Sequence, residues 1–149
     1  MTNNLRAFLA MIAVSEGTAR LGSNGGYDVL VGGTLFDGYE DHPREVVNLS
    51  RRLKSTAAGR YQILERIWDY YSKRMGLTDF SPESQDLVAV RLIKECDALE
   101  DIDAGRIEAA IKKCRRIWAS FPGAGYGQHE NKLAGLLEAY KAAGGVIKT

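Results

Sequence analysis

The sequence predicts a single α+β domain that is mainly helical and carries one small antiparallel β-sheet. The chain has 149 residues, enough for one domain with a sizeable core and too few for two ordinary ones. Hydrophobic residues make up 45% of it and charged residues 26%, which is typical of folded globular proteins and argues against disorder. Amphipathic helical patterns recur along most of the chain, whereas β-favouring runs are confined to one glycine-rich segment.

The first helix is predicted from an apolar pattern that stops at residue 16. Its apolar positions recur at i, i+3, i+4 and i+7 and are Leu5, Phe8, Leu9 and Ile12. Gly17 can adopt the positive φ that ends a helix, which leaves Glu16 at the edge of any cleft that the next loop covers. Apolar surroundings would raise the pKa of Glu16 from ~4.3 towards roughly 6, so we expect a proton donor near neutral pH. The alternative is a solvated carboxylate at a helix end.

The small sheet is predicted directly after this helix, in a segment rich in glycine. Two β-favouring runs, 27–31 and 34–36, are joined by Gly32 and Gly33, a dipeptide typical of tight hairpins. No phosphate-binding glycine motif is present, so turns explain the glycines better than a nucleotide site does.

An irregular polar stretch is expected next. Residues 39–44 form a polar turn, and Pro43 could begin a short helical piece that reaches Val47. The segment 50–56 is basic and could contact phosphate, but it lacks interleaved aromatic residues, so a solvated loop is the favoured interpretation.

Four more helices are predicted. They cover 63–75, a stretch that opens at Pro82, about 103–118, and about 130–143. Basic residues at 112–116 lie opposite the apolar stripe of the third of these helices, which makes a DNA-recognition helix conceivable. A solvated basic face is the commoner case, and the net charge of only +1 gives no field that would attract nucleic acid.

The cysteines and histidines predict no metal site, and we expect no cofactor. Cys96 and Cys114 lack C-x-x-C spacing and nearby histidines, so we expect buried free thiols, with a disulfide between them as the alternative. His42 and His129 are interpreted as surface or capping residues. The N-terminus has no signal-peptide pattern and no apolar run approaches 18 residues, so we expect synthesis in a cytosol and no stable membrane insertion.

A second glycine-rich loop at 120–128 carries Tyr126 at its tip. An aromatic ring beside flexible backbone suits the face of a sugar.

Many short motifs, in order and over nearly the whole chain, resemble those of the bacteriophage lambda endolysin family. They are SEGT at 15–18, GYDVLVGG at 26–33, DHPR at 41–44, LKST at 53–56, GRYQ at 59–62, DFSP at 79–82, SQD at 84–86 and WASFPGAGYGQ at 118–128. The resemblance implies a lysozyme-like fold, with the sheet next to the catalytic cleft, and a lytic transglycosylase that acts on bacterial peptidoglycan.

The same resemblance implies a role for each matched site residue. Glu16 would be the sole catalytic carboxyl, protonating the glycosidic oxygen between N-acetylmuramic acid and N-acetylglucosamine and then, as a carboxylate, removing a proton. The C6 hydroxyl of the same muramic residue would attack C1 and give a 1,6-anhydro product. The implied substrate-binding residues are Arg60, Tyr61, Gln62, Tyr126 and Gln128. Tyr61 and Gln62 would line the cleft floor, whereas Arg60 could instead be structural.

Two other readings of the chain stay open, a hydrolytic lysozyme that uses Glu16 with Asp28 and a water molecule, and a non-catalytic peptidoglycan-binding module. The resemblance further implies a monomer whose partner is the glycan strand. By analogy with phage lysis, it would accumulate in the host cytoplasm and act in the periplasm after a holin permeabilises the membrane. The glycine-rich segments 22–33 and 123–127 are expected to be mobile lips over the cleft.

Overall fold

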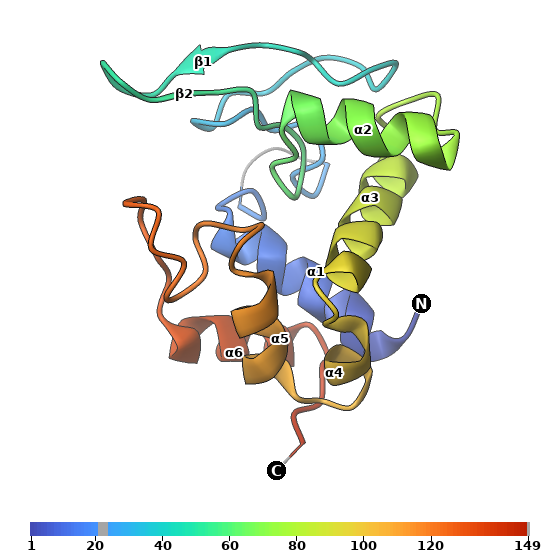
Figure 1. Ribbon diagram of the computed structural model, residues 1–149, viewed down its shortest axis with the longest axis vertical. Helices are drawn as coiled ribbons and strands as arrows, with labels where there is room; N and C mark the ends of the chain where they lie inside the picture. The colour runs from blue at the N-terminus through green and yellow to red at the C-terminus, as the bar shows by residue number, and fades with distance from the viewer. Residues whose placement is uncertain (21–23, 149) are drawn as a thin grey trace. The chain divides into compact units, whose positions relative to one another are not determined.

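A computed structural model describes residues 1–20 and 24–148 of the chain (Figure 1). In order, the described elements are α1 (Asn3–Ser15), β1 (Val47–Asn48), β2 (Lys54–Ser55), α2 (Glu65–Met75), α3 (Pro82–Glu95), α4 (Leu99–Asp103), α5 (Ile107–Cys114) and α6 (Leu133–Ala142). The predicted α+β class, mainly helical with one small antiparallel sheet, is confirmed. The chain divides into two compact units, one of Met1–Glu16 with Val90–Thr149 and the other of Gly17–Ala89.

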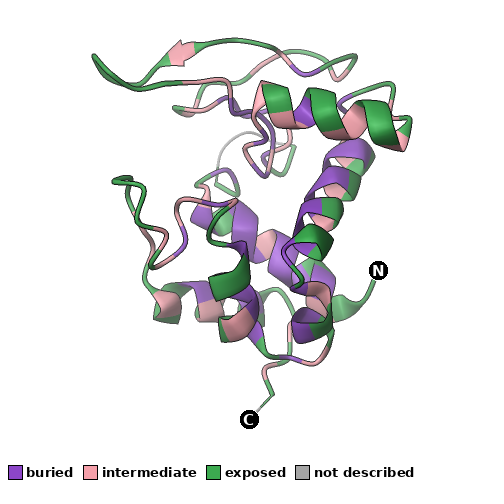
Figure 2. Ribbon diagram, viewed as in Figure 1, coloured by how far each residue is buried: buried purple, intermediate pink, exposed green. Residues whose placement is uncertain are grey.

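Helix α1 is the central element of the first unit and packs against α4 and α6. Its predicted apolar face is confirmed, because Phe8 and Ile12 are fully buried, and Figure 2 shows most of α1 as buried. The helix begins where the Thr2 hydroxyl accepts a hydrogen bond from the Leu5 amide at 3.1 Å, which satisfies one of the free amides of the first turn.

The helix predicted over about 103–118 is present as α5 but is shorter, since it begins at Ile107 and ends at Cys114, and the short helix α4 before it was not predicted. Gly105, with φ +80°, lies between them. The chain near Lys148 returns to this point: the Lys148 amide donates to the Gly105 carbonyl at 3.0 Å, and a Cβ on Gly105 would lie 2.8 Å from the Lys148 nitrogen. The close approach of the C-terminal segment therefore requires a glycine at this position. The last helix, predicted over about 130–143, is also shorter, because α6 covers only Leu133–Ala142.

Several basic residues after α4 form ion pairs or hydrogen bonds within the first unit. Asp101 of α4 is buried and forms ion pairs with Arg106 at 2.8 Å and Lys113 at 2.6 Å, and Arg116 donates to the Glu95 carbonyl at 3.0 Å. These contacts tie α4, α5 and the end of α3 together, a structural role for the residues considered above as a DNA-recognition face.

The sheet of the second unit lies later in the chain than predicted. The expected hairpin at 27–36 is reduced to one bridge, Val29 with Leu35, and the sheet pairs β1 with β2. The reason is a non-local partner: the Val31 amide donates to the Ala57 carbonyl at 3.0 Å and the Gly59 amide to the Val29 carbonyl at 2.8 Å. The backbone groups of 29–31 are thus shared with 57–59.

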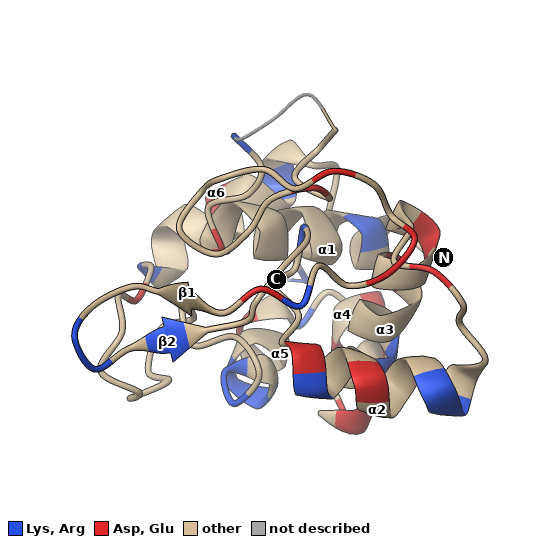
Figure 3. Cartoon of the chain, turned by 90° about the horizontal axis from the view of Figure 1, so that it is seen from above, with Lys and Arg blue, Asp and Glu red and all other residues tan. Residues whose placement is uncertain are grey.

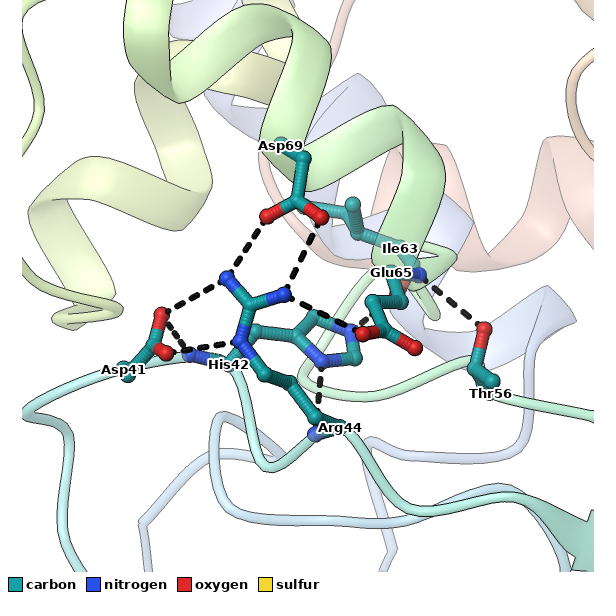
Figure 4. Close-up of polar contacts among 7 residues, drawn as sticks. All are labelled: Asp41, His42, Arg44, Thr56, Ile63, Glu65 and Asp69. Atoms are coloured by element: carbon teal, nitrogen blue, oxygen red, sulfur yellow. Dashed lines mark hydrogen bonds and ion pairs between the residues drawn. The ribbon is translucent and has the colours of Figure 1, made fainter.

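The predicted helical piece from Pro43 to Val47 is also wrong. Arg44 has φ +55°, which a helix does not allow, and its guanidinium forms ion pairs with Asp41 at 2.7 Å, Glu65 at 3.1 Å and Asp69 at 2.6 Å (Figure 4). These ion pairs join the turn to α2.

His42 lies in the interior beneath this cluster and not at the surface as expected. It is 2% exposed, its Nδ1 accepts from the Arg44 amide at 3.0 Å, and its Nε2 contacts the Ile63 carbonyl at 2.8 Å (Figure 4). Since Nδ1 is an acceptor, Nε2 carries the proton and donates. Burial lowers the pKa of His42, which keeps the ring neutral.

Gln85, at the start of α3, holds three backbone segments of the second unit together. It is fully buried, its Oε1 accepts from the Arg60 amide at 3.0 Å, and its Nε2 donates to the Tyr27 carbonyl at 3.1 Å and the Phe80 carbonyl at 2.9 Å. Gly59 allows this approach, since a Cβ there would overlap the Gln85 side chain.

Both cysteines are buried free thiols, as predicted. Within residues 1–20 and 24–148, no helix is long and apolar enough to cross a bilayer, and no three His, Cys, Asp or Glu side chains are grouped so that they could hold a metal ion.

Replacing Gln85 with Leu is expected to lower the free energy of unfolding by about 3–5 kcal/mol, because three buried backbone groups lose their partners. Urea denaturation monitored by circular dichroism measures this. The control Leu87→Gln, at a 49% exposed position of the same helix, should stay within about 0.5 kcal/mol of the parent. Equal stability of both variants would contradict the assigned role of Gln85.

Candidate active site

Glu16 ends α1, as the sequence predicts. Its amide donates to the Ile12 carbonyl at 2.8 Å, and Gly17 follows with φ +77°. A Cβ on Gly17 would meet nothing within 4 Å, so the backbone conformation and not crowding favours glycine here. The rigid last turn of a buried helix therefore positions the Glu16 carboxyl.

A chain of polar side chains leads to that carboxyl. The Ser120 hydroxyl donates to Glu16 Oε2 at 3.4 Å, and the hydroxyls of Ser15 and Ser120 are 2.7 Å apart. The Asn131 amide donates to the Ser15 hydroxyl at 3.0 Å and to the Ser15 carbonyl at 2.9 Å. Since Asn131 can only donate through Nδ2 and the Ser120 proton points to Glu16, Ser15 donates to Ser120. The donors thus all point towards Glu16 Oε2.

The packing around Ser120 fixes the position of its hydroxyl. Trp118 and Phe121 are buried on either side of it, and the Phe121 ring meets Phe8 of α1 edge to face with centroids 6.3 Å apart. The Asn131 amide nitrogen of the backbone also donates to the Ser120 carbonyl at 2.7 Å. Both the ring contacts and the backbone therefore hold Ser120 against α1.

Burial raises the pKa of Glu16 from 4.5 to about 7, and the hydrogen bond from Ser120 opposes part of that rise. The direction confirms the sequence-based expectation, and the value lies above the ~6 that apolar surroundings alone suggested. A carboxyl with this pKa exists in both protonation states near neutral pH, as an acid that must later act as a base requires.

The second glycine-rich loop belongs to the same unit as Glu16. The Glu130 carboxylate accepts hydrogen bonds from the amides of Gly123 at 2.9 Å and Gly125 at 3.0 Å, which holds the base of the loop. Tyr126 is 57% exposed, and its hydroxyl donates to the Arg116 carbonyl at 3.4 Å. Gln128 is also exposed. The predicted sugar-binding residues of this loop are therefore accessible.

The other predicted binding residues lie in the second unit, where two of them are structurally committed. Tyr61 is 1% exposed and its hydroxyl donates to Asp86 at 2.6 Å, and the Tyr27 hydroxyl donates to the same oxygen at 2.9 Å. Burial and the Asp86 charge raise the pKa of Tyr61. Arg60 donates to the Tyr27 hydroxyl at 3.2 Å and lies over the rings of Tyr27 and Tyr61. The structural role given above as the alternative for Arg60 is thus supported by direct contacts with the two tyrosines.

The side chain of Gln62 has an oxygen that can still accept a hydrogen bond. Gln62 has φ +53°, and its Nε2 donates to the carbonyls of Gly59 at 2.8 Å and Val29 at 3.1 Å. Within the part of the chain that the structure describes, its Oε1 has no hydrogen-bond partner, so this oxygen is available to a ligand.

Asp28, the candidate for a second catalytic carboxylate, is 9% exposed, and its Oδ2 accepts a hydrogen bond from the Asn24 side chain at 3.0 Å.

The glycine-rich segments 22–33 and 123–127 were expected to be mobile lips over the cleft. Gly22 lies outside the described residues, and the mobility of both segments stays a prediction.

Sequence reasoning missed the polar chain that supports Glu16. Ser15 and Ser120 stand inside two of the motifs, but nothing in a sequence pairs residues 105 positions apart. Asn131 lies outside every motif. The two serines inside the motifs were the only available signal.

An acid of raised pKa at the end of a buried helix, in a mainly helical α+β fold, is the arrangement that the proton donor of a lysozyme-like enzyme requires. Comparison with known proteins agrees with this class. A model of the endolysin family matches residues 6–147, and the chain belongs to that family.

Two relatives cover almost the whole chain. The endolysin of Escherichia phage lambda is 55% identical over 99% of this chain and 96% of its own length, and that of Escherichia phage P2 is 54% identical over 96% and 94%. A solved structure of the bacteriophage lambda lysozyme in complex with a chitohexasaccharide matches with a TM-score of 0.98 at 55% identity, covering 99% of this chain and 98% of the other. Another structure of the lysozyme from bacteriophage lambda gives 0.93 at 54% identity with the same coverage.

Replacing Glu16 with Gln is expected to stabilise the protein at alkaline pH. The raised pKa means that the folded chain binds more protons than the unfolded chain between pH 4.5 and about 7, so wild-type stability is full below that window and falls as pH rises through it. Gln carries no proton to lose. At pH ~8 the free energy of unfolding of the variant should exceed that of wild type by up to about 3 kcal/mol, and at pH ~4 the two values should be similar.

Urea denaturation at several pH values measures this difference. The control Leu87→Gln, at a 49% exposed position, removes no titratable group, so its difference from wild type should be the same at every pH. A Glu16→Gln difference that does not change with pH would contradict the raised pKa.

Proposed function

We propose that this chain is a peptidoglycan lytic transglycosylase in which Glu16 acts alone, first as general acid and then as general base. The observation that carries the proposal is the pKa of about 7 for Glu16, with the carboxyl held by the serine and asparagine chain. Membership of the endolysin family supports peptidoglycan as the substrate. A glycan also suits the site because the matching lambda lysozyme structure is a complex with a chitohexasaccharide.

The reaction balances with no group other than Glu16 and the substrate. Neutral Glu16 gives its proton to the glycosidic oxygen as the bond from that oxygen to muramic C1 breaks. The C6 hydroxyl of the same sugar forms the new bond to C1, and its proton passes to the Glu16 carboxylate. Neutral Glu16 is regenerated, the product carries a 1,6-anhydro ring, and water takes no part.

The serine and asparagine chain would position the acid. Because Ser120 donates to Oε2, that oxygen serves as an acceptor, and the transferable proton is carried by Oε1. Ser15 and Asn131 act through Ser120 and are positioning residues. A fixed carboxyl orientation is useful here, since proton transfer depends on geometry before it depends on pKa.

The other site residues would bind the glycan in different ways. The free Oε1 of Gln62 can accept an N-acetyl N–H, and the exposed ring of Tyr126 can stack on a sugar face, with Gln128 supplying a polar contact. Arg60 and Tyr61 act by shaping the backbone that presents Gln62, because their side chains are engaged with Tyr27 and Asp86.

The contacts of Asp28 favour a transglycosylase over a hydrolytic lysozyme. A carboxylate that activates water must reach that water, whereas Asp28 is nearly buried and accepts a hydrogen bond from Asn24. A non-catalytic binding module would have no use for a carboxyl whose pKa is raised to about 7.

The biological setting follows from the same proposal. A monomer would accumulate in the host cytoplasm, reach the periplasm once a holin has permeabilised the membrane, and lyse the host there by cutting the wall.

Digestion of purified peptidoglycan in heavy-oxygen water tests the reaction type. We expect products that are one water lighter than hydrolysis products and carry no label at muramic C1, as measured by mass spectrometry. Glu16→Gln should slow their formation by ~10²–10⁴ or more. Asp28→Asn should keep the product type and stay within about tenfold of wild-type turnover, since no acid–base step is assigned to Asp28. Label at C1 in most products would identify a hydrolase.

A further inference from the structure

Cys96 and Cys114 lie against each other at the ends of two helices, and the proposed catalysis uses neither. Cys96 directly follows α3, and its amide donates to the Leu92 carbonyl at 3.0 Å, whereas Cys114 is the last residue of α5. The Cys114 thiol donates a hydrogen bond to the Cys96 sulfur. Both residues belong to the first unit, so the two thiols are paired inside one compact body.

Two contacts hold these helix ends together on either side of the thiols. The Arg116 guanidinium donates to the Glu95 carbonyl at 3.0 Å, and the Lys113 ammonium donates to the Asp97 carbonyl at 3.1 Å. Both neighbours of Cys96 in the chain are thus bound to residues next to Cys114 or two positions from it. Sulfur atoms in hydrogen-bonding contact need to approach by only roughly 1–2 Å to reach the ~2.05 Å separation of a disulfide bond.

The two thiols differ in access and in charge. Cys96 is 7% exposed and stands between the exposed residues Glu95 and Asp97, whereas Cys114 is fully buried. The hydrogen bond from Cys114 and the charge of Arg116 lower the pKa of Cys96 to about 7, against the opposing effect of burial. The same hydrogen bond and burial raise the pKa of Cys114. Cys96 is therefore the thiolate that can react first, and Cys114 the thiol that can react with its product.

Positive charge surrounds the pair on the α5 side. Every residue of 112–116 other than Cys114 is Lys or Arg, and Figure 3 shows this basic end of α5 in blue. Lys113 forms an ion pair with Asp101 at 2.6 Å. Arg116 forms no ion pair within the part of the chain that the structure describes, so its charge can stabilise a thiolate at Cys96. The same segment would attract a small disulfide that carries carboxylates.

We propose that Cys96 and Cys114 form a dithiol site that a small-molecule disulfide oxidises to an intramolecular disulfide. The Cys96 thiolate attacks one sulfur of the small disulfide, forms a mixed disulfide and expels the other sulfur as a thiolate. The Cys114 thiol then gives up its proton, attacks the Cys96 sulfur and expels the second thiolate. In total the protein loses two protons and two electrons, and the small disulfide is reduced to two thiols.

The new bond would tie the end of α3 to the end of α5 and close the segment 97–113, which contains α4, into a loop. Such a loop lowers the entropy of the unfolded chain, so the oxidised form should be the more stable one. The proposed passage from the host cytoplasm to the periplasm would carry the dithiol from a reducing to an oxidising compartment. The oxidation itself requires neither that passage nor Glu16, and it goes beyond the proposed catalysis.

Oxidation of the reduced, folded chain by oxidised glutathione tests the proposal. After an acid quench and alkylation of the remaining thiols in denaturant, intact mass spectrometry should show a monomer about 2 Da lighter than the reduced chain and without alkylation. The melting temperature of this product should be higher by roughly 5–10 °C and should return to the original value after reduction.

Single substitutions separate the roles of the two thiols. Cys114→Ala should accumulate a glutathione adduct on Cys96, because no second thiol releases it, whereas Cys96→Ala should form at least about tenfold less adduct. Arg116→Gln should slow the oxidation at pH ~7 about three- to fivefold, because the thiolate fraction of Cys96 falls. The matched control Arg91→Gln, at an exposed position of α3, should react like wild type.

Circular dichroism and the urea midpoint establish that each variant is folded. A folded wild-type chain that keeps both thiols in excess oxidised glutathione, or that reacts only in urea, would overturn the proposal. Equal adduct formation by the two cysteine variants, or covalent dimers in place of the intramolecular bond, would do the same. Glu16→Gln should form the disulfide like wild type, so this result stands apart from the outcome of the catalytic proposal.

Discussion

The interaction on which the site depends is the burial of one carboxyl at the end of α1. The apolar face of that helix fixes the backbone of Glu16, and the surrounding protein removes water from its side chain. Desolvation raises the pKa to about 7, and a single hydrogen bond from Ser120 keeps the rise from being larger. Ser120 in turn depends on Ser15 and Asn131, and on the ring packing of Phe8 with Phe121.

This arrangement places function and stability in opposition. A carboxyl that is easier to protonate in the folded state costs stability whenever it is charged, so the protein carries this cost at the neutral pH where an acid–base group is useful. The rest of the first unit offsets it with a well-packed core. In the second unit, Gln85 and the Arg44 cluster hold irregular loops in place of a large sheet. Gln85 does so through three hydrogen bonds to backbone groups, and Arg44 through solvent-exposed ion pairs.

Local signals were sufficient to place Glu16 at the end of the first helix and to predict most helices. The apolar spacing of α1, followed by Glu16 and Gly17, predicts both where the helix ends and which carboxyl lies there. Features that depend on distant partners could not be predicted. The glycine between α4 and α5 is in contact with the C-terminal segment near Lys148. The backbone of 29–31 pairs with 57–59 in place of a complete hairpin over 27–36. The hydrogen bond between Ser15 and Ser120 likewise exists only once the chain is folded.

The most direct test of the account is a titration of the Glu16 carboxyl by carbon-13 nuclear magnetic resonance, with the Glu16→Gln spectrum identifying the signal. The account predicts a midpoint near pH 7 in wild type. It also predicts a higher midpoint in Ser120→Ala, because the hydrogen bond that favours the charged form is removed. A midpoint near the ordinary value of 4.5, unchanged by the Ser120 substitution, would contradict it.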